Sequence, residues 1–176
     1  MRILFLSDIH GVPSTLEAVL HEAETLRPDR IVLLGDLLYH GPRNGVPHPY
    51  DPERVASILN SRKTELLAVR GNCDTEVDQM MLEFPILGDF AELDTDGRRF
   101  FLTHGHRWNE YNLPPLGAGS ILAHGHTHIP SLRELPGSGV TVFNPGSISL
   151  PKGPEGRTYG FWDGEKLSIR PVLDRP

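Results

Sequence analysis

The stretch from Ile121 to His128 (ILAHGHTH) constrains this chain most, because a short apolar run ends directly in alternate histidines. An apolar run of this length, bounded by polar residues, is typical of a buried strand. Alternate side chains of an extended segment point to the same side, so His124, His126 and His128 could present their imidazoles to one point. Imidazole is the commonest metal ligand in proteins, so the stretch indicates a metal site if the rest of the chain supplies matching ligands.

Four other apolar runs also end in side chains that can bind metals. These endings are Asp8 and His10 after residues 2–7, Asp36 after residues 30–34, Asn72 after residues 65–70, and His104 after residues 98–103. Each residue alone could be an ordinary turn former or a residue at a helix end. Five such endings are better explained by one metal centre, built on loops that a rigid sheet holds in place.

Three helices are predicted in the first half of the chain. The first, over residues 14–26, opens with Ser14 and Glu17 at the spacing of a capping box, and the second runs over residues 51–62 behind an Asp-Pro cap. The third is expected to be capped by Asp74 and to bury an apolar stripe: Val77, Met80, Met81 and Phe84. Alternating strands and helices favour a parallel sheet covered by helices.

The second half of the chain predicts mostly antiparallel strands. Residues 90–95 and 98–103 flank Asp96-Gly97, which is typical of a type I′ hairpin, and further strands are predicted at 140–143, 159–162 and 167–172. Asn144 to Ser147 is interpreted as a structural turn. Two sheets packed face to face, with helices outside, would accommodate both halves. No linker or repeat divides the chain, so we expect residues 1–176 to form one domain.

Composition argues against several classes of function. A formal net charge of −6, with no basic run longer than two residues, argues against an extended nucleic-acid-binding surface. The apolar core of the first segment, residues 3–6, is too short for a signal peptide or a membrane span, so we expect no membrane partner and a cytoplasmic location. A single cysteine excludes an internal disulfide and fits a reducing compartment.

The set of candidate ligands mixes nitrogen and oxygen donors, which favours Mn²⁺, with Fe or Zn²⁺ as alternatives. The set is too large for one ion and suits two, which a carboxylate can bridge when they are roughly 3.5–4 Å apart. Two divalent ions held by two carboxylates and neutral imidazoles keep a net positive charge, which suits a phosphate ester. Water bound to such metals supplies a hydroxide nucleophile near neutral pH.

Taken together, the motifs resemble the signature of the calcineurin-like metallophosphoesterases. They are Asp8-x-His10, Gly35-Asp36, Gly71-Asn72-x-Asp74, His104-Gly-His106 and Gly125-His126-x-His128. The segments His40-Gly-Pro-Arg-Asn44 and Asn144-Pro-Gly-Ser147 are similar to the small bacterial YfcE-type phosphodiesterases of this superfamily. The resemblance implies a four-layer αββα sandwich of two mixed sheets flanked by helices, a small phosphodiester substrate and a homo-oligomer.

The resemblance also implies a role for each motif residue. One metal ion would be held by Asp8, His10 and His128, and the second by Asn72, His104 and His126, with Asp36 as the bridge between them. The catalytic residues would be Asn72, Cys73, Asp74 and His104. The substrate-binding residues would be Arg43, Asn44, Cys73 and His106. His124 and His106 are left over by the metal assignment, and they are pocket residues or ordinary surface histidines.

Cys73 departs from the pattern of most of the superfamily, in which a histidine at this position binds the phosphate and protonates the leaving group. A neutral thiol carries no positive charge and is a poorer proton donor, and general acid help is typically worth about 10²–10⁴-fold in rate. We therefore expect a preference for esters with good leaving groups. A nucleophilic Cys73 is the weaker alternative, because the sequence shows no positively charged partner for a thiolate.

Two other functions remain open at this point. The first is a scaffolding or binding module on the same fold, as in the retromer subunit, since a fold alone does not define an activity. A scaffold would be free to lose its ligands, whereas all seven candidate metal ligands are present. The second is a phosphomonoesterase, which would use the same metals and differ in the shape of its pocket.

Overall fold

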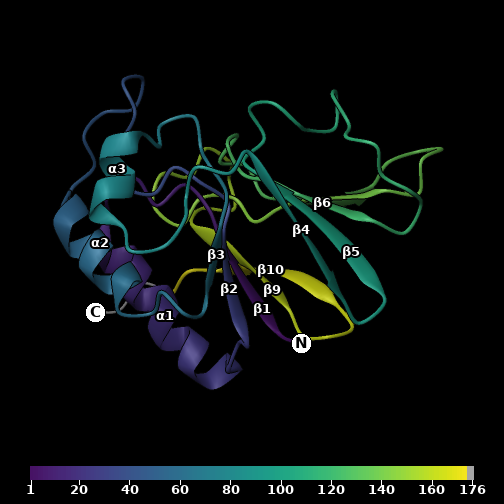
Figure 1. Ribbon diagram of the computed structural model, residues 1–176, viewed down its shortest axis with the longest axis horizontal. Helices are drawn as coiled ribbons and strands as arrows, with labels where there is room; N and C mark the ends of the chain where they lie inside the picture. The colour runs from purple at the N-terminus through teal and green to yellow at the C-terminus, as the bar shows by residue number, and fades with distance from the viewer. Residues whose placement is uncertain (174–176) are drawn as a thin grey trace.

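Two mixed five-stranded sheets face each other in the computed structural model, which describes residues 1–173, and three helices lie beside one of them (Figure 1). In the first sheet β1 (Ile3–Leu6), β2 (Arg30–Leu33) and β3 (Leu66–Ala68) run parallel. β9 (Thr158–Trp162) pairs antiparallel with β1, and β10 (Leu167–Pro171) pairs antiparallel with β9. The expected fold class, two mixed sheets flanked by helices, is confirmed.

The continuous apolar sequence of β1 follows from its position between two hydrophobic layers. Ile3 and Phe5 point into the core between the two sheets, whereas Leu4 and Leu6 point into the core beneath the helices, and all four are fully buried. Successive side chains of a strand face opposite sides of the sheet, so a strand buried on both faces is apolar at every position.

The helices α1 (Pro13–Leu26), α2 (Pro52–Asn60) and α3 (Glu76–Met81) lie along the outer face of the first sheet (Figure 1). Asp51 caps α2 as predicted, because its side chain accepts a hydrogen bond from the Arg54 N–H at 2.9 Å. The prediction of a capping box at Ser14 was wrong, since α1 begins at Pro13 and its N-cap, Val12, makes no side-chain cap. Proline suits that first position because its missing N–H would be unpaired there in any case.

The second sheet has the strand order β4-β5-β6-β8-β7. Its strands are β4 (Phe90–Thr95), β5 (Arg98–Thr103), β6 (Ile121–Ala123), β7 (Ser131–Glu134) and β8 (Thr141–Asn144). β5, β6 and β8 run parallel while the edge strands are antiparallel, so the expectation of mostly antiparallel strands was only half right. Among the described residues, the outer face of this sheet is covered by the side chains of Trp108 and Leu116 in the β5–β6 loop, where the resemblance implied a fourth layer of helix.

Two further predictions were wrong for reasons of long-range packing. Asp74 does not cap α3; Thr75 does, in a capping box with Asp78. Val77 and Met80 are 67% and 86% exposed, so this half of the predicted apolar stripe lies outside the core, whereas Met81 and Phe84 pack in it as predicted. β7 was not predicted, because its sequence is largely polar and exposed at a sheet edge. Within residues 1–173, none of the helices is long and apolar enough to span a membrane.

Candidate metal centre

The carboxyl ends of the central strands of both sheets meet at one place, and the loops that follow them carry the predicted ligands (Figure 1). Backbone hydrogen bonds align these loops with one another. The Asp8 N–H donates to the Gly35 carbonyl at 3.1 Å, the His10 N–H to the Asp36 carbonyl at 3.0 Å, and the Gly125 N–H to the His104 carbonyl at 2.8 Å. Ligands that are distant in sequence are therefore adjacent in space.

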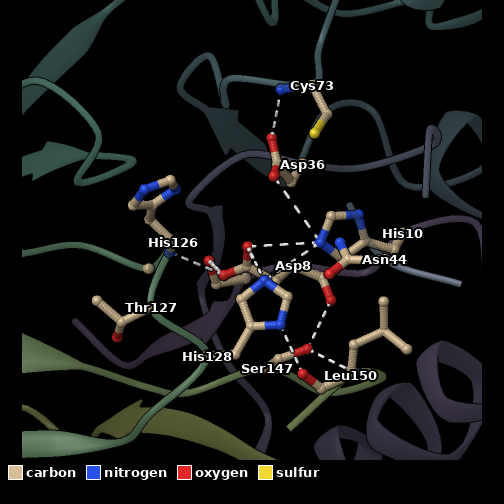
Figure 2. Close-up of polar contacts among 12 residues, drawn as sticks. Asp8, His10, Asp36, Asn44, Cys73, His126, Thr127, His128, Ser147 and Leu150 are labelled. Carbon is tan, nitrogen blue, oxygen red and sulfur yellow. Dashed lines mark hydrogen bonds and ion pairs between the residues drawn. The ribbon is translucent and has the colours of Figure 1, made fainter. Parts of the chain in front are cut away.

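Asp8, His10 and His128 form the first group of candidate ligands, as Figure 2 shows. The Asp8 Oδ1 atom lies 3.1 Å from His128 Nε2 and 3.7 Å from His10 Nε2, and the two Nε2 atoms are 3.4 Å apart. All three side chains are almost fully buried, and Asp8 Oδ1 accepts no hydrogen bond. A buried carboxylate oxygen is costly to leave without a partner, so this group fits a cation.

Asp36, Asn72, His104 and His126 form the second group of candidate ligands. His104 Nε2 lies 3.5 Å from Asp36 Oδ2, 3.1 Å from Asn72 Oδ1 and 3.3 Å from His126 Nδ1. Asp36 Oδ2 also lies 3.8 Å from His10 Nε2 in the first group. One carboxylate oxygen therefore faces ligands of both groups, which is the position that a bridging ligand needs.

Five of these residues have left-handed backbone conformations that side chains other than glycine rarely adopt. Their φ angles are 55° at Asp8, 49° at His10, 56° at Asp36, 69° at His126 and 59° at His128. Each such residue costs about 1–2 kcal/mol relative to an ordinary conformation. Strain of this kind persists where the surrounding structure imposes it and gathers at functional sites, so it supports the assignment of this place as the site.

The second ring nitrogen of three histidines is held by a backbone carbonyl. His10 Nδ1 donates to the Tyr39 carbonyl at 2.8 Å, and His104 Nδ1 donates to the Leu34 carbonyl at 2.7 Å. His128 Nδ1 donates to the Leu150 carbonyl at 2.5 Å. These contacts fix the tautomer and leave each Nε2 free to bind a cation, which is the usual arrangement around a metal-ligating histidine.

Asp8 is held by the backbone of His126 and by two serines, Ser7 and Ser147, that the sequence did not mark as site residues. Its Oδ2 atom accepts hydrogen bonds from Ser7 Oγ at 2.6 Å and from the His126 N–H at 3.0 Å. Its backbone carbonyl accepts from Ser147 Oγ at 2.8 Å. Gly125 is required beside it, because a Cβ there would collide with Ser7 and with the Asp8 carboxylate. These contacts orient the free Oδ1 atom toward His10 and His128.

The electrostatics of the two groups show an affinity for positive charge. Burial acts to raise the pKa of Asp8, but its contacts with His10 and His128 and the charge of His104 hold that pKa well below the usual value. Burial acts to lower the pKa of His104, yet the contact with Asp36 and the charge of Asp8 raise it to about 9. Two buried carboxylates thus draw a proton onto a buried histidine, and divalent cations can supply the same positive charge.

The Cys73 thiol is 8% exposed and lies beside Asp36. The Cys73 N–H donates to Asp36 Oδ1 at 2.8 Å, and the Asn72 side-chain amide donates to Cys73 Sγ at 3.1 Å. Burial and the charge of Asp36 raise the pKa of Cys73 to about 12. A thiol with this pKa stays protonated at neutral pH, which argues against a nucleophilic thiolate.

Three other predicted site residues lie outside the cleft described below. Asp74 is 1% exposed and accepts hydrogen bonds from the N–H groups of Asp36, Leu37 and Gly71. Burial raises the pKa of Asp74 to about 6. His106 is half-buried, with its ring centroid 5.5 Å from that of His104. His124 is buried beside the β5–β6 loop, with its Nε2 atom 3.4 Å from the Glu110 carboxylate.

A cleft of about 540 Å³ opens over the candidate metal centre. Its walls include Asp36, Asn72, Cys73, His126 and His128. The loop after Asp36 contributes Arg43 and Asn44, as the sequence predicted, and the β8–β9 loop contributes Lys152, which it did not. The sequence could not predict this, because a single lysine in a loop forms no motif that would place it at a cleft. A cleft of this size can hold a nucleotide-sized ligand.

Comparisons with known proteins show the family of this chain. Residues 1–166 match the calcineurin-like phosphoesterase superfamily domain, so the chain belongs to that superfamily. The chain is 44% identical over 175 residues to phosphodiesterase YfcE of Escherichia coli (strain K12), covering 99% of this chain and 94% of YfcE. The solved YfcE structure superposes with a TM-score of 0.92 and covers 98% of this chain and 93% of that chain.

More distant relatives share part of the chain or only its fold. Phosphodiesterase MJ0936 of Methanocaldococcus jannaschii is 27% identical over 131 residues, which are 68% of this chain and 74% of that protein. The Zn²⁺ complex of Vps29 from Entamoeba histolytica has a TM-score of 0.59 at 21% identity, covering 96% of this chain and 90% of that chain. The second likeness concerns the fold alone. The resemblance found in the sequence motifs is confirmed.

Proposed function

We propose that this protein is a phosphodiesterase that works with two divalent metal ions, most favourably Mn²⁺. The observation that carries the proposal is the position of Asp36 Oδ2, which lies 3.8 Å from His10 Nε2 and 3.5 Å from His104 Nε2. One buried carboxylate thus faces both groups of nitrogen ligands. The identity of 44% to a phosphodiesterase over nearly the whole chain supports the reaction class.

In this proposal the first ion is held by Asp8, His10 and His128. The second is held by Asn72, His104 and His126, and Asp36 bridges the two. Such ions lower the pKa of water and stabilise negative charge on the phosphoryl oxygens. The mixed nitrogen and oxygen donors suit Mn²⁺, Fe or Zn²⁺.

The cleft residues then bind the ester and position it. Arg43 is exposed on the cleft wall and can donate two parallel N–H groups to two non-bridging phosphoryl oxygens. Asn44 is held by a hydrogen bond from its amide to the His40 carbonyl at 2.8 Å, which orients the loop beside Arg43. His106 lies behind His104 and His126, so we assign it to supporting those ligands in place of binding substrate.

In this proposal Cys73 keeps the limited role expected from its departure from the family pattern, whereas Asp74 does not have the catalytic role that the resemblance implied. Cys73 offers a neutral thiol at the cleft, so it supplies neither positive charge nor an efficient proton, and the preferred substrates are esters with good leaving groups. Asp74 accepts three backbone N–H groups at 2.7–2.9 Å and holds the turns that carry Asp36 and Gly71. We therefore assign Asp74 as a positioning residue.

Hydrolysis of bis-p-nitrophenyl phosphate tests the proposal. Protein stripped with a chelator should be inactive and should recover on addition of Mn²⁺. Asp36→Asn should lower the Mn²⁺-dependent rate by on the order of 100-fold or more. Even the mutation of a residue that only hydrogen-bonds to a metal ligand typically costs 10–100-fold in metal affinity or activity. Asp94→Asn, which removes a surface carboxylate paired with Arg99, serves as the matched control and should keep full activity.

The other outcomes of that assay separate the remaining functions. Absence of turnover with any divalent metal, in folded protein, would favour the scaffolding module. Faster cleavage of p-nitrophenyl phosphate than of the diester would favour a phosphomonoesterase. A cytoplasmic location, a single domain over residues 1–176 and a homo-oligomer stay predictions, and residues 174–176 lie outside the part that the structure describes.

A further inference from the structure

Lys152 lies in the β8–β9 loop and is tied to a proposed metal ligand through the backbone. The Lys152 N–H donates to the His128 carbonyl at 3.1 Å, and the Leu150 carbonyl accepts from the ring of His128. These two contacts hold the start of the lysine side chain in a fixed place relative to the metal centre. The side chain lines the same cleft as Arg43, which comes from the loop after β2.

Among residues 1–173, the charged groups around the cleft do not pair with the Lys152 ammonium. Several other basic side chains are paired with acidic ones, as in Arg54–Glu17 and Arg133–Glu110. Within residues 1–173, by contrast, the Lys152 ammonium and the Arg43 guanidinium make no ion pair and no side-chain hydrogen bond. Glu155, the acidic residue of the same loop, lies against Gly153 and does not pair with the lysine.

A simple phosphodiester carries one negative charge, which the metal ions and Arg43 already suffice to bind. Lys152 is then a second cation over the same cleft, and no acidic group within residues 1–173 neutralises it. We propose that Lys152 is a specificity-determining residue that binds a second phosphate group of the substrate, so that the preferred substrates are phosphodiesters carrying an additional phosphate. This inference rests on the proposed phosphodiesterase function and names its substrate class.

The cleft volume supports a substrate of that size. About 540 Å³ is far more than a phosphodiester group alone occupies and falls within the range of pockets that hold nucleotide-sized ligands. A lysine ammonium on a flexible stem binds phosphate as a point charge, so it can follow a phosphate attached to different scaffolds. The inference therefore specifies the charge of the substrate, not its base or sugar.

Two substrates that differ by one phosphate test the inference. Thymidine 5′-(p-nitrophenyl phosphate) and the same compound with a 3′-phosphate share the scissile bond and the leaving group. On Mn²⁺-loaded protein the 3′-phosphate should raise kcat/KM roughly tenfold, the size expected for one charge-assisted hydrogen bond. Lys152→Gln should abolish that gain, so that the two substrates are cleaved at equal kcat/KM, whereas Lys152→Arg should keep most of the gain.

Lys166→Gln is the matched control, because it removes the same charge from the exposed β9–β10 turn beside the N-terminus, away from the site loops (Figure 1). Calorimetry measures binding without catalysis. Its result is therefore the same whichever of the two phosphates of the ligand lies at the metal centre. Thymidine 3′,5′-bisphosphate should bind the Mn²⁺-loaded protein about tenfold more tightly than thymidine 5′-phosphate, and Lys152→Gln should remove this difference.

The outcomes separate the inference from the proposed function. Cleavage of both substrates at equal rates, with equal affinities for the two nucleotides, would overturn the role of Lys152 and leave the phosphodiesterase intact. A gain that survives in Lys152→Gln would assign the second phosphate to another residue and overturn the inference as well. Failure to cleave either substrate with any divalent metal would refute the proposed function itself.

Discussion

Ser147 connects two parts of the candidate metal centre, and its hydroxyl is a precise place to test how the ligands are held. The Ser147 Oγ atom donates to the Asp8 carbonyl at 2.8 Å and accepts from the N–H groups of Ser149 at 3.1 Å and Leu150 at 2.8 Å. The Leu150 carbonyl in turn accepts from the ring of His128 (Figure 2). One buried hydroxyl thus links the backbone of one proposed ligand to the side chain of another.

Ser147→Ala removes these three hydrogen bonds at a residue with 0% exposure, where water cannot replace the hydroxyl. Each bond contributes about 1 kcal/mol net, and buried groups left unpaired cost somewhat more, so the free energy of unfolding should fall by about 3 kcal/mol. Loss of a contact that orients a metal-ligating histidine costs 10–100-fold in metal affinity, and we expect a loss in that range for Mn²⁺.

Two measurements separate these effects. Urea unfolding of chelator-treated protein, followed by circular dichroism, gives the loss of stability, and calorimetric titration with Mn²⁺ gives the loss of affinity. Ser138→Ala is the matched control: Ser138 makes two side-chain hydrogen bonds, with Leu135 and Val140, in the β7–β8 turn. Ser138 is only half-buried, so water can partly replace its two bonds, and we expect this variant to lose about 1 kcal/mol and no Mn²⁺ affinity. Unchanged Mn²⁺ affinity in Ser147→Ala would refute the reasoning that this hydroxyl orients the ligands.

Three further variants test other parts of the structure. Cys73→His supplies a cationic proton donor at the cleft, so kcat on diesters with poor leaving groups should rise by about 10²-fold, and an unchanged kcat would contradict the assigned role. Gly125→Ala places a methyl group against the Asp8 carboxylate, and urea unfolding should show a loss of about 2–3 kcal/mol. An unfolding midpoint equal to that of the unaltered protein would show that the site can absorb the methyl group. Burial and a hydrogen bond to Glu22 raise the pKa of Tyr159 to about 12 in the folded protein, above its ordinary value of about 10. The folded state therefore holds this proton more tightly, so the stabilisation is complete below pH 10 and is lost at about 1.4 kcal/mol per pH unit as the pH rises toward 12. Tyr159→Phe should remove that slope in urea unfolding at pH 9–11, and a slope that persists would assign it to another group.

Local patterns in the sequence determined the parts of the fold that depend on near neighbours. The apolar runs around Ile3–Leu6 and Ile121–Ala123 are strands because they are short, apolar and bounded by polar residues. Asp96 and Gly97 form the predicted turn, with φ angles of 51° and 72°, because both positions need a left-handed backbone. The metal-ligand types at strand ends also follow from the sequence, since parallel strands bring their carboxyl ends to one edge.

Only the tertiary structure decided features that depend on residues far apart in the chain. Val77 and Met80 match a helical stripe but face solvent, because no element packs over that side of α3 within the described residues. Asp74 has the sequence context of a helix cap. Its carboxylate instead accepts hydrogen bonds from the N–H groups of Leu37 and Asp36, which are 37 and 38 residues away in sequence. The position of Lys152 beside His128 likewise follows from a backbone contact between two loops. Periodicity and spacing report local geometry, whereas these contacts exist only once the two sheets have packed together.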